Sequence, residues 1–264
     1  MTEPVYQLDE EQQAQLARDG FCRIPGVLSA TRCRQVRQRL VAAAEESRRR
    51  GVPTYIDTLD PNDRNVRVFN LLDLDPVFQE LIRHPVALTA VRHVLGDEFL
   101  ISNFTANIAL PGSRSMGLHS DQSLVMPEPW IHTWTLNVIW CLDRVHETNG
   151  ATRYVPGSHR CTTRAKLPAN AASNTSWFEA DAGDILLMEG RLWHTSGCNT
   201  TADEERALLF GYYCRDFIRP QVNWNAQLSP ATQAALDEPM RAWLGLGPAA
   251  NVHVGAPLIR AIFD

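Results

Sequence analysis

The sequence predicts a mainly β protein with flanking α-helices, arranged as a sandwich or double-sheet barrel. Helix signals dominate up to about residue 96, and short β-rich runs separated by Gly, Pro and Asn follow. Many short strands broken by turns are typical of such two-sheet architectures. The 264 residues suffice for one compact unit. We expect a single domain over 1–264, with a helical part at about 8–96, a β core at about 97–220, and a C-terminal helix and tail at 221–264.

Three helices are predicted before the β core. Residues 29–51 begin with Ser29, a good N-cap residue, carry apolar residues at helical spacing and end at a glycine. Asp75-Pro76 is a cap followed by proline at the first helical position, which indicates a second helix. Pro85 begins the third, which a glycine closes at residue 96.

Four β-rich runs make up the predicted core. They are Phe99–Leu110, Trp134–Leu142, Asp184–Met188 and Ala207–Tyr213. The second run alternates large apolar residues with polar or smaller ones, which predicts one face against the core. A last helix is expected near Ser229–Leu244, again from a cap and a proline. The tail after Gly247 has no assignable pattern.

Composition and charge argue against several classes of function. A net charge of −5 does not suit nucleic-acid or acidic-membrane binding. The acidic start resembles no signal or transit peptide, and no apolar stretch is long enough to cross a bilayer. The six cysteines show no CxxC pairing, so we expect buried, reduced thiols. We therefore expect a cytoplasmic monomer or homodimer that binds a small molecule and neither nucleic acid nor membrane.

His119 and Asp121 form the first candidate metal site. On an extended strand, residues two apart project to the same side, so both could bind one ion. The pattern is short, and a surface histidine beside a turn aspartate explains it equally well. His194, directly after the β-rich run at 183–188, could supply a third ligand. Two histidines and one carboxylate leave positions open, which suits an iron(II) oxygenase better than a four-coordinate zinc hydrolase.

Arg206 begins the apolar run ALLFGYY and is a candidate ligand for an anion. A guanidinium aimed inward from a strand would be a buried charge, which is costly unless paired. Its planar fork can bind a carboxylate through two hydrogen bonds, as the distal carboxylate of 2-oxoglutarate requires. The alternative is a salt bridge to the neighbouring Glu204 or Glu205.

Together with further motifs, these residues make the sequence resemble the phytanoyl-CoA dioxygenase family. The matching pieces are Asp19–Phe21, Gly26–Ser29, His119-Ser120-Asp121, the stretch NGATRYVPGSHR at 149–160, Gly183-Asp184 and Trp193–Gly197. They occur in order between about residues 15 and 220, and the NG…PGSHR stretch is the most specific of them.

The resemblance implies a double-stranded β-helix (jelly-roll, cupin-like) core and an oxidoreductase that uses iron(II), 2-oxoglutarate and dioxygen. It places the iron on His119, Asp121 and His194, and the distal carboxylate of 2-oxoglutarate on Arg206. The further candidates for the cosubstrate pocket are Ser196, Asn107 and Thr152.

The implied reaction oxidises an unactivated C–H bond and releases succinate and carbon dioxide, with hydroxylation, desaturation, cyclisation or epimerisation as outcomes. The loop after the iron ligands is expected to border the substrate through Gln122, Trp130 and His132, although its composition would equally suit barrel core. We predict a small hydrophobic secondary metabolite as substrate. A primary-metabolic hydroxylase of an amino acid or acyl compound is the main alternative. A non-catalytic jelly-roll binding protein would have no reason to keep an open iron site, and a zinc hydrolase would not need Arg206 or the PGSHR turn.

Overall fold

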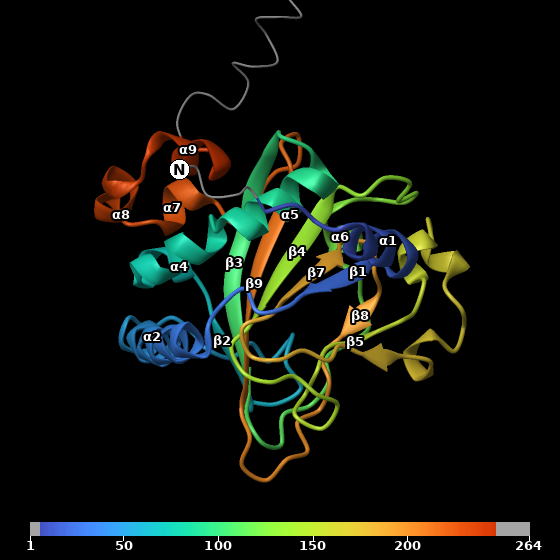
Figure 1. Ribbon diagram of the computed structural model, residues 1–264. Coiled ribbons are helices and arrows are strands. Elements are labelled where there is room, and N and C mark those ends of the chain that lie inside the picture. The colour runs from blue at the N-terminus through green and yellow to red at the C-terminus, as the bar shows by residue number, and fades with distance from the viewer. Residues whose placement is uncertain (1–5, 247–264) are drawn as a thin grey trace, which may run out of the picture.

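An antiparallel six-stranded sheet and a three-stranded sheet form the centre of the computed structural model, which describes residues 6–246 (Figure 1). The large sheet has the order β1 (Phe21–Ile24), β7 (Ile185–Glu189), β4 (Thr135–Cys141), β9 (Arg206–Arg215), β3 (Phe99–Ala109), β2 (Asn65–Val68). The small sheet has the order β6 (Ser176–Trp177), β5 (Arg153–Tyr154), β8 (His194–Thr195). The predicted mainly β fold with flanking helices is confirmed, and the sheets do not close into a barrel.

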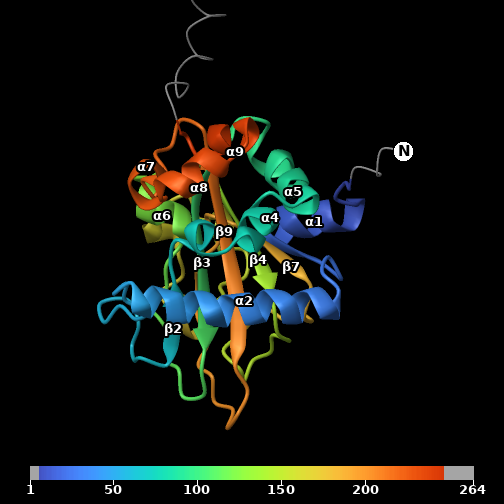
Figure 2. The same ribbon diagram turned by 90° about the vertical axis from the view of Figure 1, so that its left-hand side faces the viewer.

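Helices from the first third of the chain cover one face of the large sheet. They are α1 (Glu10–Asp19), α2 (Ala30–Arg49), α3 (Leu71–Leu74), α4 (Pro76–Ile82) and α5 (Pro85–Leu95). In Figure 2, α2 runs across the strands β3 and β9. The predicted caps are confirmed, since the Ser29 side chain accepts a hydrogen bond from the Arg32 amide and Asp75 accepts one from the Val77 amide. Apolar side chains of these helices, among them Leu40 and Phe78, are fully buried against the sheet.

Both faces of strand β4 are buried. Its alternate residues Leu136, Val138 and Trp140 belong to the core beneath the helices, as the alternation predicts. The intervening Asn137 and Ile139 are also buried, which the sequence does not indicate. Their face looks away from the helices, toward the second sheet and the cavity described below, so even its polar residues are shielded from water.

Two of the sequence-based boundaries need correction. The first third is not purely helical, because β1 pairs with β7 and β2 pairs with β3, so both complete the large sheet at its edges. The helix predicted at Ser229–Leu244 is instead two short helices, α8 (Pro230–Ala235) and α9 (Glu238–Trp243). The chain extends at Leu236, and Asp237 starts α9 by accepting a hydrogen bond from the Met240 amide. The tail after Gly247 lies outside the described residues.

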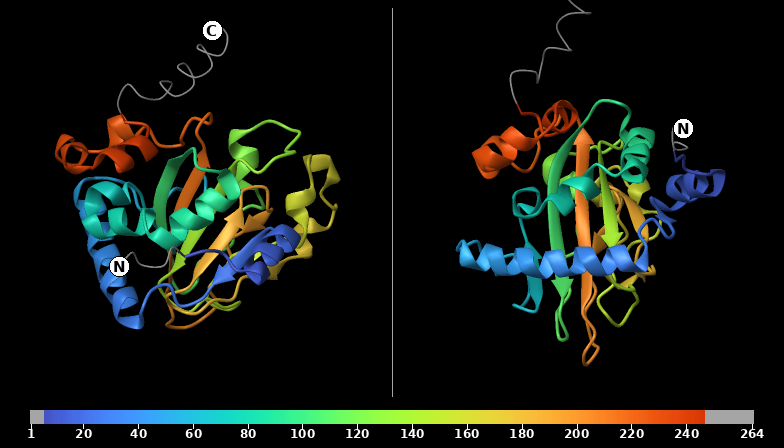
Figure 3. Two further views of the ribbon diagram at one scale, coloured as in Figure 1. Left: turned by 45° about the horizontal axis from the view of Figure 1, so that its top comes forward. Right: turned by 60° about the vertical axis from the view of Figure 1, so that its left-hand side comes forward.

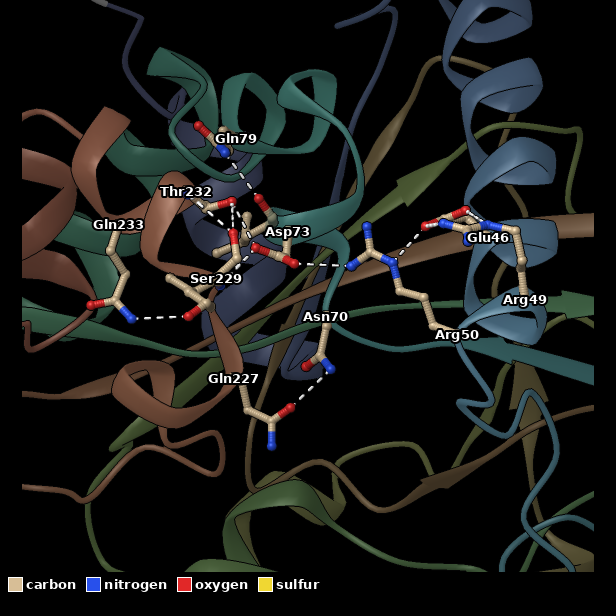
Figure 4. Close-up of polar contacts among 12 residues, drawn as sticks. Glu46, Arg49, Arg50, Asn70, Asp73, Gln79, Gln227, Ser229, Thr232 and Gln233 are labelled. Atoms are coloured by element: carbon tan, nitrogen blue, oxygen red, sulfur yellow. Dashed lines mark hydrogen bonds and ion pairs between the residues drawn. The ribbon is translucent and has the colours of Figure 1, made fainter.

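The C-terminal helices, which begin with α7 (Trp224–Gln227), lie at one end of β3 and β9 (Figure 3). Asp73 in α3 holds them there, as Figure 4 shows. One carboxylate oxygen accepts hydrogen bonds from the Ser229 amide (2.8 Å) and the Thr232 hydroxyl (2.6 Å). The other accepts one, at 3.0 Å, from Arg50, the C-cap residue of α2. A single carboxylate therefore connects α2, α3 and the start of α8.

The sequence predicts buried, reduced cysteines and no segment long enough to cross a bilayer. Cys22, Cys33, Cys141 and Cys214 are buried free thiols, as predicted, whereas Cys161 is half-buried and Cys198 is exposed. Within residues 6–246, no helix combines the length and the apolar character needed to cross a membrane.

Candidate metal centre

His119, Asp121 and His194 meet at one point. Each offers one ligand atom, and these atoms all lie within 4.8 Å of one another. Asp121 Oδ1 lies 3.7 Å from His119 Nε2 and 3.8 Å from His194 Nε2. Two nitrogen or oxygen ligands about 2.1 Å from a common ion are at most about 4.2 Å apart, so both separations suit a shared first-row metal.

Backbone pairing brings these distant residues together. His119 and His194 form an isolated antiparallel bridge, with amide-to-carbonyl hydrogen bonds of 3.0 and 2.7 Å. Ser120 between His119 and Asp121 is extended, so the two ligands project to the same side, as predicted. Asp121 itself is not on a strand: it is the first residue of α6 (Asp121–Val125), whose N-cap is Ser120.

Hydrogen bonds to backbone carbonyls fix the orientation of both imidazoles. His119 Nδ1 lies 3.0 Å from the Gly117 carbonyl oxygen, and His194 Nδ1 lies 2.9 Å from that of Leu192. Since a carbonyl only accepts, each Nδ1 carries the hydrogen, which leaves the Nε2 lone pair free for an ion. Burial lowers the pKa of His194, which favours the neutral form that binds metals.

Arg206 is a buried cation without an acidic partner in the described part of the chain. Only 1% of the residue is exposed. Its terminal nitrogens donate to Asn107 Oδ1 (3.3 Å) and to the Gly150 carbonyl (2.8 Å), and Nε has no partner within residues 6–246. Burial lowers the pKa of Arg206 to about 10. The salt-bridge alternative is wrong, because Glu204 pairs with a histidine and Glu205 with another arginine.

A cavity of about 240 Å³ joins the three metal-binding candidates to Arg206. Ser196, Asn107 and Thr152, the further candidates for the cosubstrate pocket, line the same cavity. Asn107 and Thr152 are 5% and 6% exposed, so they form part of its buried wall. The Asn107 Nδ2 has no partner among the described residues. The structure therefore places all seven of these side chains around one space.

The three candidate substrate contacts do not line this cavity. Gln122 is fully buried, and its amide bonds the His132 carbonyl and the Trp134 amide, so it closes the loop that follows α6. Trp130 is buried against Trp193, with ring centroids 6.2 Å apart. His132 is exposed.

Other residues line the cavity that the sequence reasoning did not single out. Asn103 and Thr105 precede Asn107 at two-residue spacing on β3, and Phe210 and Tyr212 are on the neighbouring β9. The alternation of polar residues along β3 is a signal that would have indicated this face. Phe210 and Tyr212 lie within a continuous apolar run, where no such signal exists.

The chain combines a jelly-roll-type fold with two histidines and a carboxylate that line a cavity. This combination is typical of oxygenases with a two-histidine, one-carboxylate facial triad. The chain belongs to the phytanoyl-CoA dioxygenase (PhyH) family, because its residues 16–207 match the sequence model of that family. It is therefore a dioxygenase, as the motifs predict.

Individual proteins agree with this assignment. Dioxygenase af480 of Aspergillus fumigatus is 47% identical over 246 residues, which cover 93% of this chain and 78% of the relative. HygX from Streptomyces hygroscopicus, solved with nickel and 2-oxoglutarate, superposes with a TM-score of 0.66 at 20% identity, covering 81% of this chain and 89% of HygX. The non-haem α-ketoglutarate-dependent carbocyclase SnoK from nogalamycin biosynthesis gives 0.65 at 22%, covering 84% and 92%. The two solved structures support the fold.

Proposed function

We propose that this chain is an iron(II)- and 2-oxoglutarate-dependent dioxygenase that oxidises an unactivated C–H bond of a small, uncharged, largely apolar secondary metabolite. Succinate and carbon dioxide are the other products. The observation that carries the proposal is that the two-histidine, one-carboxylate cluster shares a cavity with a buried arginine that lacks an acidic partner among the described residues.

The residues of the cavity fit both groups. His119, Asp121 and His194 would hold the iron(II), whose open positions allow it to bind 2-oxoglutarate and to activate dioxygen. Arg206 would bind the distal carboxylate, because Nε and the second hydrogen of each terminal nitrogen are free to donate. The Nδ2 of Asn107, which has no partner among residues 6–246, is a further donor in the same wall.

Charge in the cavity favours an uncharged substrate. The only other arginine that lines it, among the described residues, is Arg67 of β2. Arg67 donates two hydrogen bonds, of 2.7 and 2.8 Å, to the buried carboxylate of Asp60. With Arg206 committed to the cosubstrate and Arg67 neutralised, an amino acid or an anionic acyl compound would have to leave its charges uncompensated.

The remaining lining is a mixture of apolar and neutral polar side chains. Leu59 and Leu124 line the cavity and are 43% and 65% exposed, so they offer apolar surface at its rim. Asn103 and Gln221 are neutral amides that bond each other at 3.2 Å. This combination favours a hydrophobic substrate with a few polar groups over the charged alternatives.

The test is cosubstrate turnover. Protein loaded anaerobically with iron(II) and 2-oxoglutarate, then exposed to oxygen with a panel of uncharged polyketide, terpenoid and alkaloid compounds, is expected to release succinate. The His119→Ala variant is expected to release none. Absence of succinate across the panel, together with no effect of His119→Ala on any activity found, would overturn the proposal. Zinc-dependent hydrolysis that ignores 2-oxoglutarate would favour the hydrolase instead.

A further inference from the structure

The two oxygens of the Asp121 carboxylate have different surroundings. Oδ1 faces the histidines, 3.7 Å from His119 Nε2 and 3.8 Å from His194 Nε2. Oδ2 accepts a hydrogen bond of 2.5 Å from Nδ2 of Asn137. Because an ionised carboxylate only accepts hydrogen bonds, the NH₂ group of Asn137 must be the side that points at Asp121.

Asn137 is held rigidly enough to orient its partner. It lies in the middle of β4, between β7 and β9, where it pairs with Met188 and Tyr212. The residue is only 6% exposed and lines the cavity. Its Oδ1 has no partner within residues 6–246, so the bond to Asp121 is the contact that sets the direction of the amide. Asp121, by contrast, lies at the start of the five-residue helix α6, and Asn137 is the hydrogen-bond donor to its carboxylate.

We propose that Asn137 is a positioning residue that keeps Asp121 a one-oxygen ligand. The inference rests on the proposed iron site. A carboxylate can bind an ion through one oxygen or through both. With two histidines and a two-oxygen carboxylate, a six-coordinate iron(II) would keep only two positions. Because a chelating 2-oxoglutarate and dioxygen together need three, Oδ2 of Asp121 would compete with the cosubstrates for the same positions and weaken their binding. By holding Oδ2, Asn137 preserves the third open position.

The proposal also explains a polar residue in a buried strand. A buried asparagine in the centre of a sheet is costly unless its amide is paired, and an apolar residue would be less costly there. Its neighbours along the same face, Thr135 and Ile139, do not line the cavity, whereas Asn137 does. The amide is therefore placed at the one position on β4 from which it contacts a metal-binding candidate.

The experiment compares Asn137→Leu with a matched control, Asn103→Leu. Both substitutions remove a cavity-lining amide and keep a similar volume, but Asn103 bonds Gln221 and does not bond Asp121. Iron(II) affinity is measured anaerobically by titration of tryptophan fluorescence, and 2-oxoglutarate affinity by the visible absorption band that forms on the iron-loaded protein. Asn137→Gln keeps an amide donor and tests for rescue.

We expect Asn137→Leu to weaken iron(II) binding, 2-oxoglutarate binding or both by about 10- to 100-fold, the usual cost of losing a hydrogen bond to a metal ligand. Asn137→Gln should recover part of the loss, and Asn103→Leu should stay within about twofold on the iron titration. Wild-type affinities in Asn137→Leu overturn the inference, as does an equal loss in Asn103→Leu. If His119→Ala also binds iron(II) like the wild type, the proposed iron site itself fails, which separates the two outcomes.

Discussion

Replacement of Arg206 by methionine separates a cosubstrate-binding role from a structural one. In the unliganded protein, burial lowers the pKa of this guanidinium from 12.5 to about 10. At about 1.4 kcal/mol for each tenfold change, that corresponds to about 3 kcal/mol against the charged form. The substitution would remove this cost but leave the Gly150 carbonyl and Asn107 Oδ1 without a donor, at about 1–3 kcal/mol each. These opposing contributions partly cancel, so we expect Arg206→Met to change the free energy of unfolding by no more than about 3 kcal/mol.

The increase in stability caused by 2-oxoglutarate should differ sharply between the wild type and Arg206→Met. At a concentration about 100 times its Kd, a ligand that binds only the folded state adds about 2.7 kcal/mol to stability. We expect this increment in the wild type and none in Arg206→Met, measured by anaerobic urea unfolding with manganese(II) as the metal. Arg206→Lys, which keeps the charge but not the planar fork, should fall between them. A full increment in Arg206→Met would refute the assignment, and a loss above about 4 kcal/mol without ligand would make Arg206 structural.

Three further predictions concern the metal site and the fold. His119→Ala should abolish metal-dependent succinate release without lowering the melting temperature of the metal-free protein; a fall of many degrees would contradict this. Burial alone would raise the pKa of Asp73, but hydrogen bonds from Thr232, Ser229 and Arg50 lower it overall, so its contribution is present above the ordinary aspartate range and is lost as pH falls below about 4. Asp73→Asn should therefore cost about 1.5–3 kcal/mol in urea unfolding at pH 7, a difference that shrinks only in acid; a pH-independent difference would contradict this. Gly183→Ala should destabilise the fold by at least about 1–3 kcal/mol, because φ is +99° and the new Cβ would lie 2.2 Å from the Leu28 carbonyl oxygen; wild-type stability would refute the clash.

The elements that sequence reasoning located share strong local signals. Residues 29–51 form a helix almost as predicted because the cap at Ser29 and the apolar spacing agree with the tertiary contacts of α2. The four β-rich runs correspond to β3, β4, β7 and β9, since each is long enough to show its pattern. By contrast, β1 and β2 have only four residues each, and their pairing with strands far along the chain leaves no trace in the local sequence.

The candidate site also contains residues that the sequence indicates and residues that only the fold reveals. His119, Asp121 and His194 could be proposed because their chemistry is distinctive and motifs surround them. The environment of Asp121 could not, because Asn137 reaches it only after β4 has taken its place in the sheet, sixteen residues away along the chain. The rest of the cavity lining is harder to predict: Tyr212 looks like one more core residue within an apolar strand, and only the pleat of β9 assigns it to the cavity.

The two histidines, Asp121 and Arg206 are each held in place by a different kind of interaction. His119 and His194 are fixed by main-chain hydrogen bonds to each other, so substitution of either side chain leaves their scaffold intact. The Asp121 carboxylate accepts a side-chain hydrogen bond from Asn137, so the proposal makes its orientation sensitive to a single substitution there. Arg206 is held without an acidic partner in the described chain, which costs stability. Under the proposed function, binding of the dicarboxylate 2-oxoglutarate would offset this cost, which is already present in the folded protein, and would gain affinity from it.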